Sequence, residues 1–255
     1  MTLRRAALAA LFLAYSGYAV AMVGATQPPG DDATRAAVLL VGSKGTSCTG
    51  VALAHDLVLT AAHCVLPGAD YKLVAFDAAR TPTLKDVAAI AAHPEFDASA
   101  ALRHRVTADV ALVRLAAPVS GAKLAQLAPA AGKVAVGDRF VVAGYGLAVR
   151  GDGKSGGTLR TASLVATGQP GSLQVRLVDP ATKGERPGLG ACTGDSGGPV
   201  YRDVGGTLMV TGVISWSTGP KMSDGCGGLT GVTPLSRYRA WVVEQAARMG
   251  SALGR

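Results

Sequence analysis

A serine in a glycine-rich stretch is the first candidate for chemistry. The segment Gly194–Pro199, with the sequence GDSGGP, sets the hydroxyl of Ser196 among three glycines and an acid. Glycines this dense indicate backbone that turns sharply or approaches another group closely. A serine hydroxyl attacks a carbonyl only when a base takes its proton and N–H groups face the developing oxyanion. Taken alone, the stretch is more typical of a surface turn before a strand, so a base elsewhere in the chain must decide.

His63 is the strongest candidate for that base. An imidazole accepts and returns a proton near neutral pH, and the small neighbours Ala61 and Ala62 leave room around the ring. An isolated histidine at a strand end more often has a structural role. The other histidines are weaker candidates because one lies in a predicted turn, one precedes a proline and one lies between two arginines: His55, His93 and His104.

Asp109 is the candidate acid, at the entrance of the apolar run 107–115. A carboxylate there either faces solvent at a strand start or is buried and must find a partner. The first alternative is the more common. A buried Asp109 bonded to His63 would fix the imidazole tautomer and stabilise the imidazolium.

Chain order separates three serine chemistries. The stretch around Ser196 also satisfies G-x-S-x-G, the nucleophile elbow of α/β hydrolases, but there the histidine follows the serine, whereas all four histidines here precede it. The subtilisin order places the acid before the histidine. The acids before His63 follow no convincing parallel strand: Asp31, Asp32 and Asp56. The order His63, Asp109, Ser196 is that of chymotrypsin.

Composition indicates a globular chain. The 255 residues are 49% hydrophobic and 16% charged, and the net charge of +8 is scattered rather than gathered into a nucleic-acid-binding run.

The first residues indicate export from the cytoplasm. Arg4 and Arg5 precede the apolar run Ala6–Tyr15, and Ala19-Val20-Ala21 offers an A-x-A cleavage site, so residues 1–21 are predicted to be a secretory signal peptide. We therefore expect a secreted or periplasmic protein with no membrane span once the signal is removed.

The four cysteines lie beyond this segment and are expected to form disulfides. Three connectivities are possible, and the local one pairs Cys48 with Cys64 and Cys192 with Cys226. No cysteine and histidine spacing indicates zinc, so neither a metal site nor a cofactor is expected.

Short apolar runs separated by Gly and Pro predict an all-β fold of barrels with one terminal helix. The helix is expected over Ser236–Met249, with Ser236 as its N-cap. The segment 116–133 is expected to cross between two halves. The strands are predicted at 36–41, 48–53, 57–60, 73–76, 87–91, 107–115, 139–144, 159–165, 173–177, 200–202, 208–216 and 231–234.

Three motifs together resemble the active-site segments of chymotrypsin/trypsin-like serine proteases: Thr60–Cys64 (TAAHC), Asp109–Leu112 (DVAL) and Gly194–Pro199 (GDSGGP). The resemblance extends over about residues 22–249 and includes Ser215-Trp216 and His93-Pro94. It implies two packed six-stranded antiparallel β-barrels with a C-terminal helix. We assign 22–125 to the N-terminal barrel and 126–255 to the C-terminal barrel.

The resemblance also implies catalytic roles. Ser196 would attack the scissile carbonyl, His63 would act as general base and then acid, and Asp109 would orient His63. The N–H groups of Gly194 and Ser196 would form the oxyanion hole. Asp195 would pair with the ammonium of a mature N-terminus at Met22, because residues 22–25 (MVGA) are similar to the family's Ile-Val-Gly-Gly start.

For substrate, the resemblance implies that Ser215, which would also support Asp109, Trp216 and Ser217 form an edge strand that pairs with an extended peptide. The expected specificity pocket is formed by Gly190, Ala191, Ser217 and Gly231. Gly190 stands where trypsin-like enzymes hold an aspartate, so we expect poor cleavage after Lys or Arg and better acceptance of apolar side chains.

These inferences predict a monomeric secreted serine endopeptidase whose partners are polypeptide substrates and protein protease inhibitors, not nucleic acid. Two alternatives remain open. One is an esterase that uses the same triad. The other is a catalytically silent binding homologue, although such proteins usually lose a triad residue and this chain has all three.

Overall fold

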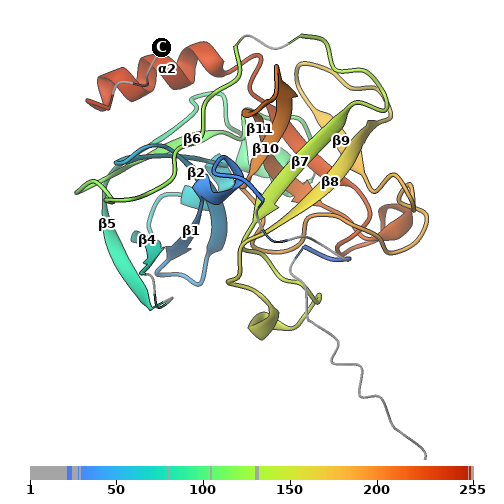
Figure 1. Cartoon of the computed structure of the whole chain (residues 1–255), viewed down its shortest axis with the longest axis horizontal. Coiled ribbons are helices and arrows are strands. Elements are labelled where there is room, and N and C mark those ends of the chain that lie inside the picture. Colours follow the sequence, from blue (N-terminus) through green and yellow to red (C-terminus); the bar gives the residue numbers. More distant parts are fainter. Residues whose placement is uncertain are drawn as a thin grey trace, which may run out of the picture.

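The protein folds into two closed six-stranded antiparallel β-barrels, as predicted (Figure 1). The computed structural model describes residues 22–24, 28, 30–77, 79, 81–103, 105–129, 132–251 and 253. The predicted signal peptide 1–21 and His104 lie outside the described residues.

The first barrel follows the order β1-β2-β3-β6-β5-β4. Its strands are β1 (Ala37–Gly42), β2 (Ser47–Ala54), β3 (Leu57–Thr60), β4 (Tyr71–Phe76), β5 (Pro82–Ala92) and β6 (Ala111–Leu115). The second barrel follows the order β10-β11-β12-β9-β8-β7. Its strands are β7 (Arg139–Gly144), β8 (Arg160–Thr167), β9 (Val175–Val178), β10 (Pro199–Val204), β11 (Thr207–Ser217) and β12 (Thr230–Pro234).

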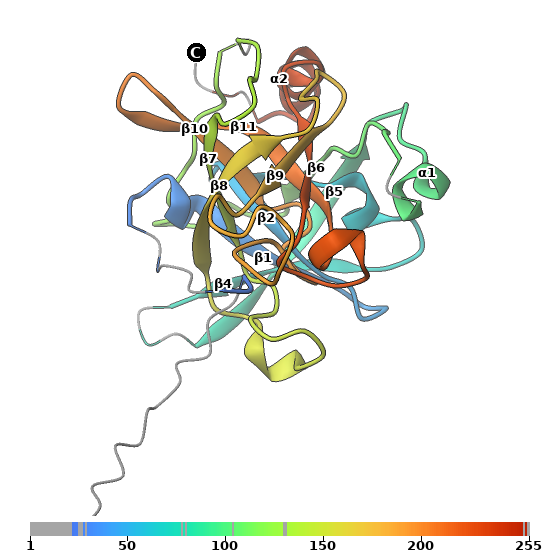
Figure 2. The ribbon, with the colours of Figure 1, turned by 90° about the vertical axis from the view of Figure 1, so that its right-hand side faces the viewer.

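The helices are short apart from the last. Short 3₁₀ turns occur at η1 (Thr34–Ala36), η2 (Ala62–Val65), η3 (Gly153–Ser155) and η4 (Pro220–Met222), and α1 (Ala98–Leu102) projects from the loop between β5 and β6 (Figure 2). The sequence reading missed α1, which begins where the Asp97 carboxylate accepts hydrogen bonds from the N–H groups of Ser99 and Ala100. None of the helices among the described residues has the length and apolar character needed to cross a membrane.

The terminal helix α2 (Arg239–Arg248) begins later than predicted, and the proposed Ser236 cap is wrong. Tyr238 occupies the N-cap position without a side-chain bond, because the Leu235 carbonyl accepts the N–H groups of both Tyr238 and Arg239. The helix lies across the first barrel although it follows the second in sequence (Figure 1). Its buried Val242 and Ala246 join a core cluster that contains residues from both barrels.

The predicted strand 107–115 is shorter in the structure and begins at Ala111. The N–H groups of Asp109 and Val110 bond the carbonyls two residues before them, Thr107 and Ala108, so this backbone turns tightly instead of joining a strand ladder. Asp109 therefore lies at the end of the barrel, two residues before β6.

Candidate active site

The candidate catalytic residues meet at the junction of the two barrels. His63 lies in η2, directly after β3, and Asp109 lies just before β6. Strands β3 and β6 pair through Thr60 and Ala111, which brings the two segments together. Ser196 lies three residues before the start of β10 in the second barrel.

Asp109 holds the imidazole of His63 in a fixed orientation. Its Oδ2 atom lies 2.8 Å from His63 Nδ1, and its Oδ1 atom accepts the backbone N–H of His63 at 2.9 Å. The Ser215 hydroxyl donates to Oδ2 at 2.5 Å. The carboxylate is completely buried, whereas the His63 side chain is 27% exposed and open to a substrate.

These donors decide the protonation state of Asp109. Burial by itself would raise the pKa of its carboxyl, but the hydrogen bonds from His63 and Ser215 outweigh burial and hold the pKa below its ordinary value. A carboxylate that stays ionised keeps the proton of His63 on Nδ1 and leaves Nε2 as the basic atom.

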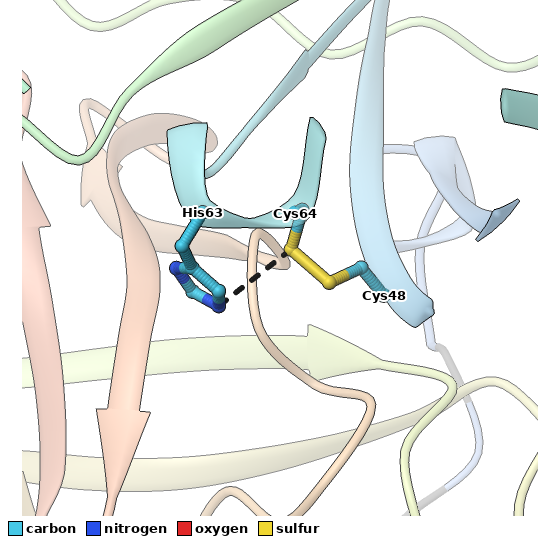
Figure 3. Close-up of side chains that lie close together, drawn as sticks. All are labelled: Cys48, His63 and Cys64. Atoms are coloured by element: carbon cyan, nitrogen blue, oxygen red, sulfur yellow. Dashed lines mark hydrogen bonds between the residues drawn. A yellow bond between two sulfur atoms is a disulfide. The ribbon is translucent and has the colours of Figure 1, made fainter. Parts of the chain in front are cut away.

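The disulfide between Cys48 and Cys64 lies beside His63 (Figure 3). His63 Nε2 is 3.7 Å from Cys64 Sγ, and the carbonyl oxygen of Ser196 is 3.6 Å from the same sulfur. The ring and the serine backbone therefore both contact one atom of the bridge. His63 and the two cysteines have their potential ligand atoms within 4.8 Å of one another, but sulfurs joined in a disulfide are not the thiolates that bind metals.

Thr49 attaches the serine loop to the first barrel, a role that the sequence reading missed. Its N–H donates to the Ser196 carbonyl at 2.8 Å, and its hydroxyl donates to the Gly194 carbonyl at 2.8 Å. The same hydroxyl accepts the N–H of Tyr145 at 3.0 Å. Thr49 is fully buried on β2, and no local pattern distinguishes it from any other strand threonine.

Two glycines allow the serine loop to take its shape. Gly197 has φ +78°, and a Cβ there would overlap Thr60 Oγ1 and the Thr49 carbonyl. Gly194 has φ +95°, and a Cβ there would stand 2.9 Å from the Cα of Gly146. Both positions thus exclude side chains for steric reasons as well as for backbone conformation.

The backbone around Gly194 presents amides that could bind an oxyanion. The Thr193 carbonyl accepts the N–H of Leu147 at 2.8 Å, and in a trans peptide the N–H of Gly194 then points the opposite way. Within the described part of the chain, neither the Gly194 nor the Ser196 N–H donates a hydrogen bond.

Asp195 is a second buried carboxylate, and it faces away from the triad. Its Oδ1 accepts the N–H of Gly146 and its Oδ2 that of Cys192, both at 2.8 Å. Burial raises the pKa of Asp195 to about 7 in spite of these bonds. Met22 is fully buried in the core of the second barrel, and Val23 forms a β-bridge with Gly190.

The structure brings most of the expected pocket residues together around the Cys192–Cys226 disulfide. Ser217 pairs with Thr230, and Trp216 pairs with Gly231. A Cβ on Gly231 would overlap the Trp216 indole, so that glycine lies beneath the ring. Neighbouring residues of a strand face opposite sides, which turns Thr230 rather than Gly231 toward Gly190.

Thr230 is therefore the residue of β12 that faces Gly190, and the sequence reading missed it. It is fully buried, and its Oγ1 accepts the N–H of Ala191 at 3.0 Å. A Cβ on Gly190 would stand 3.5 Å from that oxygen. Thr230 and Gly231 face opposite sides of β12. Which of them faces Gly190 follows only from the pairing of Ser217 with Thr230, which the sequence does not show.

Replacement of Ser215 by alanine tests the support of Asp109. The variant leaves a buried acceptor without one donor, so we expect a loss of about 1–3 kcal/mol in the free energy of unfolding at pH 7. Because the folded-state pKa of Asp109 is lowered, its ionised form stabilises the fold above the unfolded-state pKa, and this contribution disappears as the pH falls. Denaturant titrations should therefore show a loss that shrinks below about pH 4. Ser223→Ala, at an exposed loop serine, is the matched control, and an equal loss in both variants would contradict the assignment.

Comparison with known proteins places the chain among proteases. The family model described as Trypsin matches residues 22–242. Coagulation factor IX from Cavia porcellus is 31% identical over 231 residues, which cover 80% of this chain and 74% of that protein. Vitellin-degrading protease from Bombyx mori is 28% identical over 218 residues, which cover 80% of this chain and 77% of that protein.

Proposed function

The chain belongs to the trypsin family and is a serine-type endopeptidase, and from this premise we propose that His63, Asp109 and Ser196 are its catalytic triad. The observation that carries the proposal is the buried Asp109 carboxylate, which bonds both Nδ1 and the backbone N–H of His63. This arrangement leaves Nε2 free to act on a hydroxyl. Ser196 supplies that hydroxyl, and its backbone carbonyl and His63 Nε2 both lie close to the Cys64 sulfur.

The reaction forms and breaks an acyl-enzyme. His63 Nε2 takes the proton of Ser196 as Oγ bonds to the scissile carbonyl carbon, and the carbonyl oxygen becomes an oxyanion held by the N–H groups of Gly194 and Ser196. The imidazolium then gives its proton to the leaving amine as the C–N bond breaks. A water molecule, deprotonated by the same nitrogen, releases the acid product and restores Ser196.

The substrate is proposed to bind as an added strand. Trp216 and Ser217 pair with β12 on one edge, and no described strand pairs with them on the other. We propose that an extended peptide binds along that other edge by main-chain hydrogen bonds. Ser215 bonds Asp109, which in turn bonds His63, so this strand ends next to the proposed triad. A peptide paired with the strand would therefore have its scissile bond beside Ser196.

Labelling with a fluorophosphonate probe tests the nucleophile. We expect the probe to modify the wild-type chain and not Ser196→Ala, whose kcat should fall about a millionfold, as in other triad enzymes. Asp109→Asn should lower kcat about ten-thousandfold, because an amide favours the wrong tautomer of His63. Ser223→Ala is again the control and should label normally. A wild-type chain that resists the probe would indicate a silent binding homologue, and labelling with hydrolysis of small esters alone would indicate an esterase.

The pocket favours small apolar side chains. Gly190 places no charge at its base, and the buried Thr230 fills the wall opposite it. Lys and Arg would thus bring a cation to a site without a carboxylate, which costs desolvation energy without a paired charge.

A peptide library tests this specificity. We expect the wild-type enzyme to cleave after small aliphatic residues and seldom after Lys or Arg. Thr230→Gly removes three heavy atoms from the wall, so kcat/KM for peptides with Leu or Phe before the scissile bond should rise about tenfold or more relative to Ala. The matched control is Thr233→Ser, at a buried threonine further along β12. Dominant cleavage after Arg or Lys would refute the assignment.

Export and maturation are proposed to be one event. Both disulfides fit an oxidising compartment, and the A-x-A site at 19–21 directly precedes Met22. Cleavage after Ala21 would create an ammonium on a residue that is buried in the second barrel, and the pairing partner proposed for it is the buried Asp195. No separate propeptide is then required.

N-terminal sequencing of the secreted enzyme tests this step, and we expect Met22 as its first residue. Removal of Met22 and Val23 from the mature enzyme should lower kcat at least a hundredfold, since the buried Asp195 carboxylate would lose its partner. A secreted, active form that starts elsewhere would exclude signal cleavage as the activating event.

A further inference from the structure

Arg160 has its Cβ on the face of the sheet that Asp195 occupies, and its Nη1 donates to the Thr158 carbonyl at 3.3 Å. Arg160 pairs directly with Gly144 across strands β8 and β7. Directly opposed residues of antiparallel strands place their side chains on the same face, with Cβ atoms about 4.5–5.5 Å apart. A Cβ on Gly144 would overlap Oδ1 of Asp195, which identifies that face.

The electrostatics agree with this placement. Burial is the largest influence on the pKa of Asp195 and raises it, the N–H groups of Cys192 and Gly146 lower it most, and the charge of Arg160 lowers it further. Burial likewise outweighs the charge of Asp195 at Arg160, so that the pKa of Arg160 is lowered. The groups hydrogen-bonded to the carboxylate are the neutral N–H groups of Gly146 and Cys192. Among the described residues, Arg160 is thus the charged side chain that changes the pKa of Asp195.

The ionised form of Asp195 matters for the oxyanion amides. As an acceptor it joins Gly146 to Cys192, and the adjacent bond from Leu147 to the Thr193 carbonyl sets the direction of the Gly194 N–H. A protonated carboxyl is a poorer acceptor for two N–H groups, because one of its oxygens then carries a hydrogen. Whatever keeps Asp195 ionised therefore keeps this arrangement.

We propose that Arg160 is a resident counter-cation for Asp195, a positioning residue that preserves the oxyanion amides in the chain that still carries the residues before Met22. This inference rests on the proposed function. In the processed enzyme the ammonium of Met22 takes over most of the role. The unprocessed chain is then a partly active enzyme rather than an inactive precursor.

The experiment compares Arg160 variants in two forms of the chain. Ala21→Leu removes the small residue that signal cleavage requires and so retains the full chain, which can be purified in mild detergent. The processed enzyme is the second form. Each form is prepared with Arg160, Arg160→Gln and Arg160→Lys. Arg176→Gln on the neighbouring strand β9, an exposed arginine, controls for the change in net charge.

At pH 8 we expect Arg160→Gln to lower kcat tenfold or more in the unprocessed chain, with KM changed less than twofold. Arg160→Lys should restore most of that loss. In the processed enzyme the same Arg160→Gln change should lower kcat less than threefold. An equal loss in both forms would assign Arg160 a merely structural role, and an unprocessed chain without activity beside an active processed enzyme would overturn the proposal.

A titration of Asp195 separates this inference from the proposed function. Carbon-13 NMR of labelled aspartate in Ser196→Ala chains follows the ionisation of Asp195 without any hydrolysis. We expect Arg160→Gln to raise the midpoint by one pH unit or more in the unprocessed chain and by less in the processed one. An unchanged midpoint overturns the role of Arg160 even if the enzyme is active. A raised midpoint, together with no hydrolysis by the processed chain that retains Ser196, supports that role and rejects the triad proposal.

Discussion

The site depends on how closely the serine loop of the second barrel approaches the first barrel. Gly197 touches β2 and β3 at atoms where no side chain would fit, and Thr49 donates two hydrogen bonds to the loop. These contacts join Ser196 to the barrel that carries His63 and Asp109. A shift of either barrel would separate Ser196 from His63, and the proposed proton transfer requires heavy atoms within about 2.6–3.2 Å.

The two buried carboxylates near Ser196, Asp109 and Asp195, have pKa values shifted in opposite directions. Asp109 has three donors, which overcome the effect of burial and hold its pKa low. Asp195 has two neutral donors and a cation at its edge, and its pKa remains raised. The first environment is complete in the folded chain. The second is the environment for which we propose a further positive charge, the ammonium of Met22, and through which we propose that activity is controlled.

The sequence allowed the fold and the identity of the candidate triad to be predicted, because each part has a local signal. Short apolar runs between glycines predicted the barrels, and chain order distinguished His63, Asp109 and Ser196 from other serine chemistries. Roles that depend on pairing between distant strands were not predictable. Thr49, Thr230 and Arg160 are ordinary strand residues until the register shows which side chain each one faces. The cap at Ser236 failed because the Leu235 carbonyl satisfies the first helical N–H groups instead.

The terminal helix has a consequence for the order in which the protein can fold during synthesis. Helix α2 covers the first barrel, where the Arg114 guanidinium bonds the Met249 carbonyl and Ser251 bonds Asp56. These partners follow both barrels in the sequence. The barrel that carries His63 and Asp109 thus lacks this cover until the barrel that carries Ser196 has been synthesised. The proposed site can therefore be completed only after both barrels have been made.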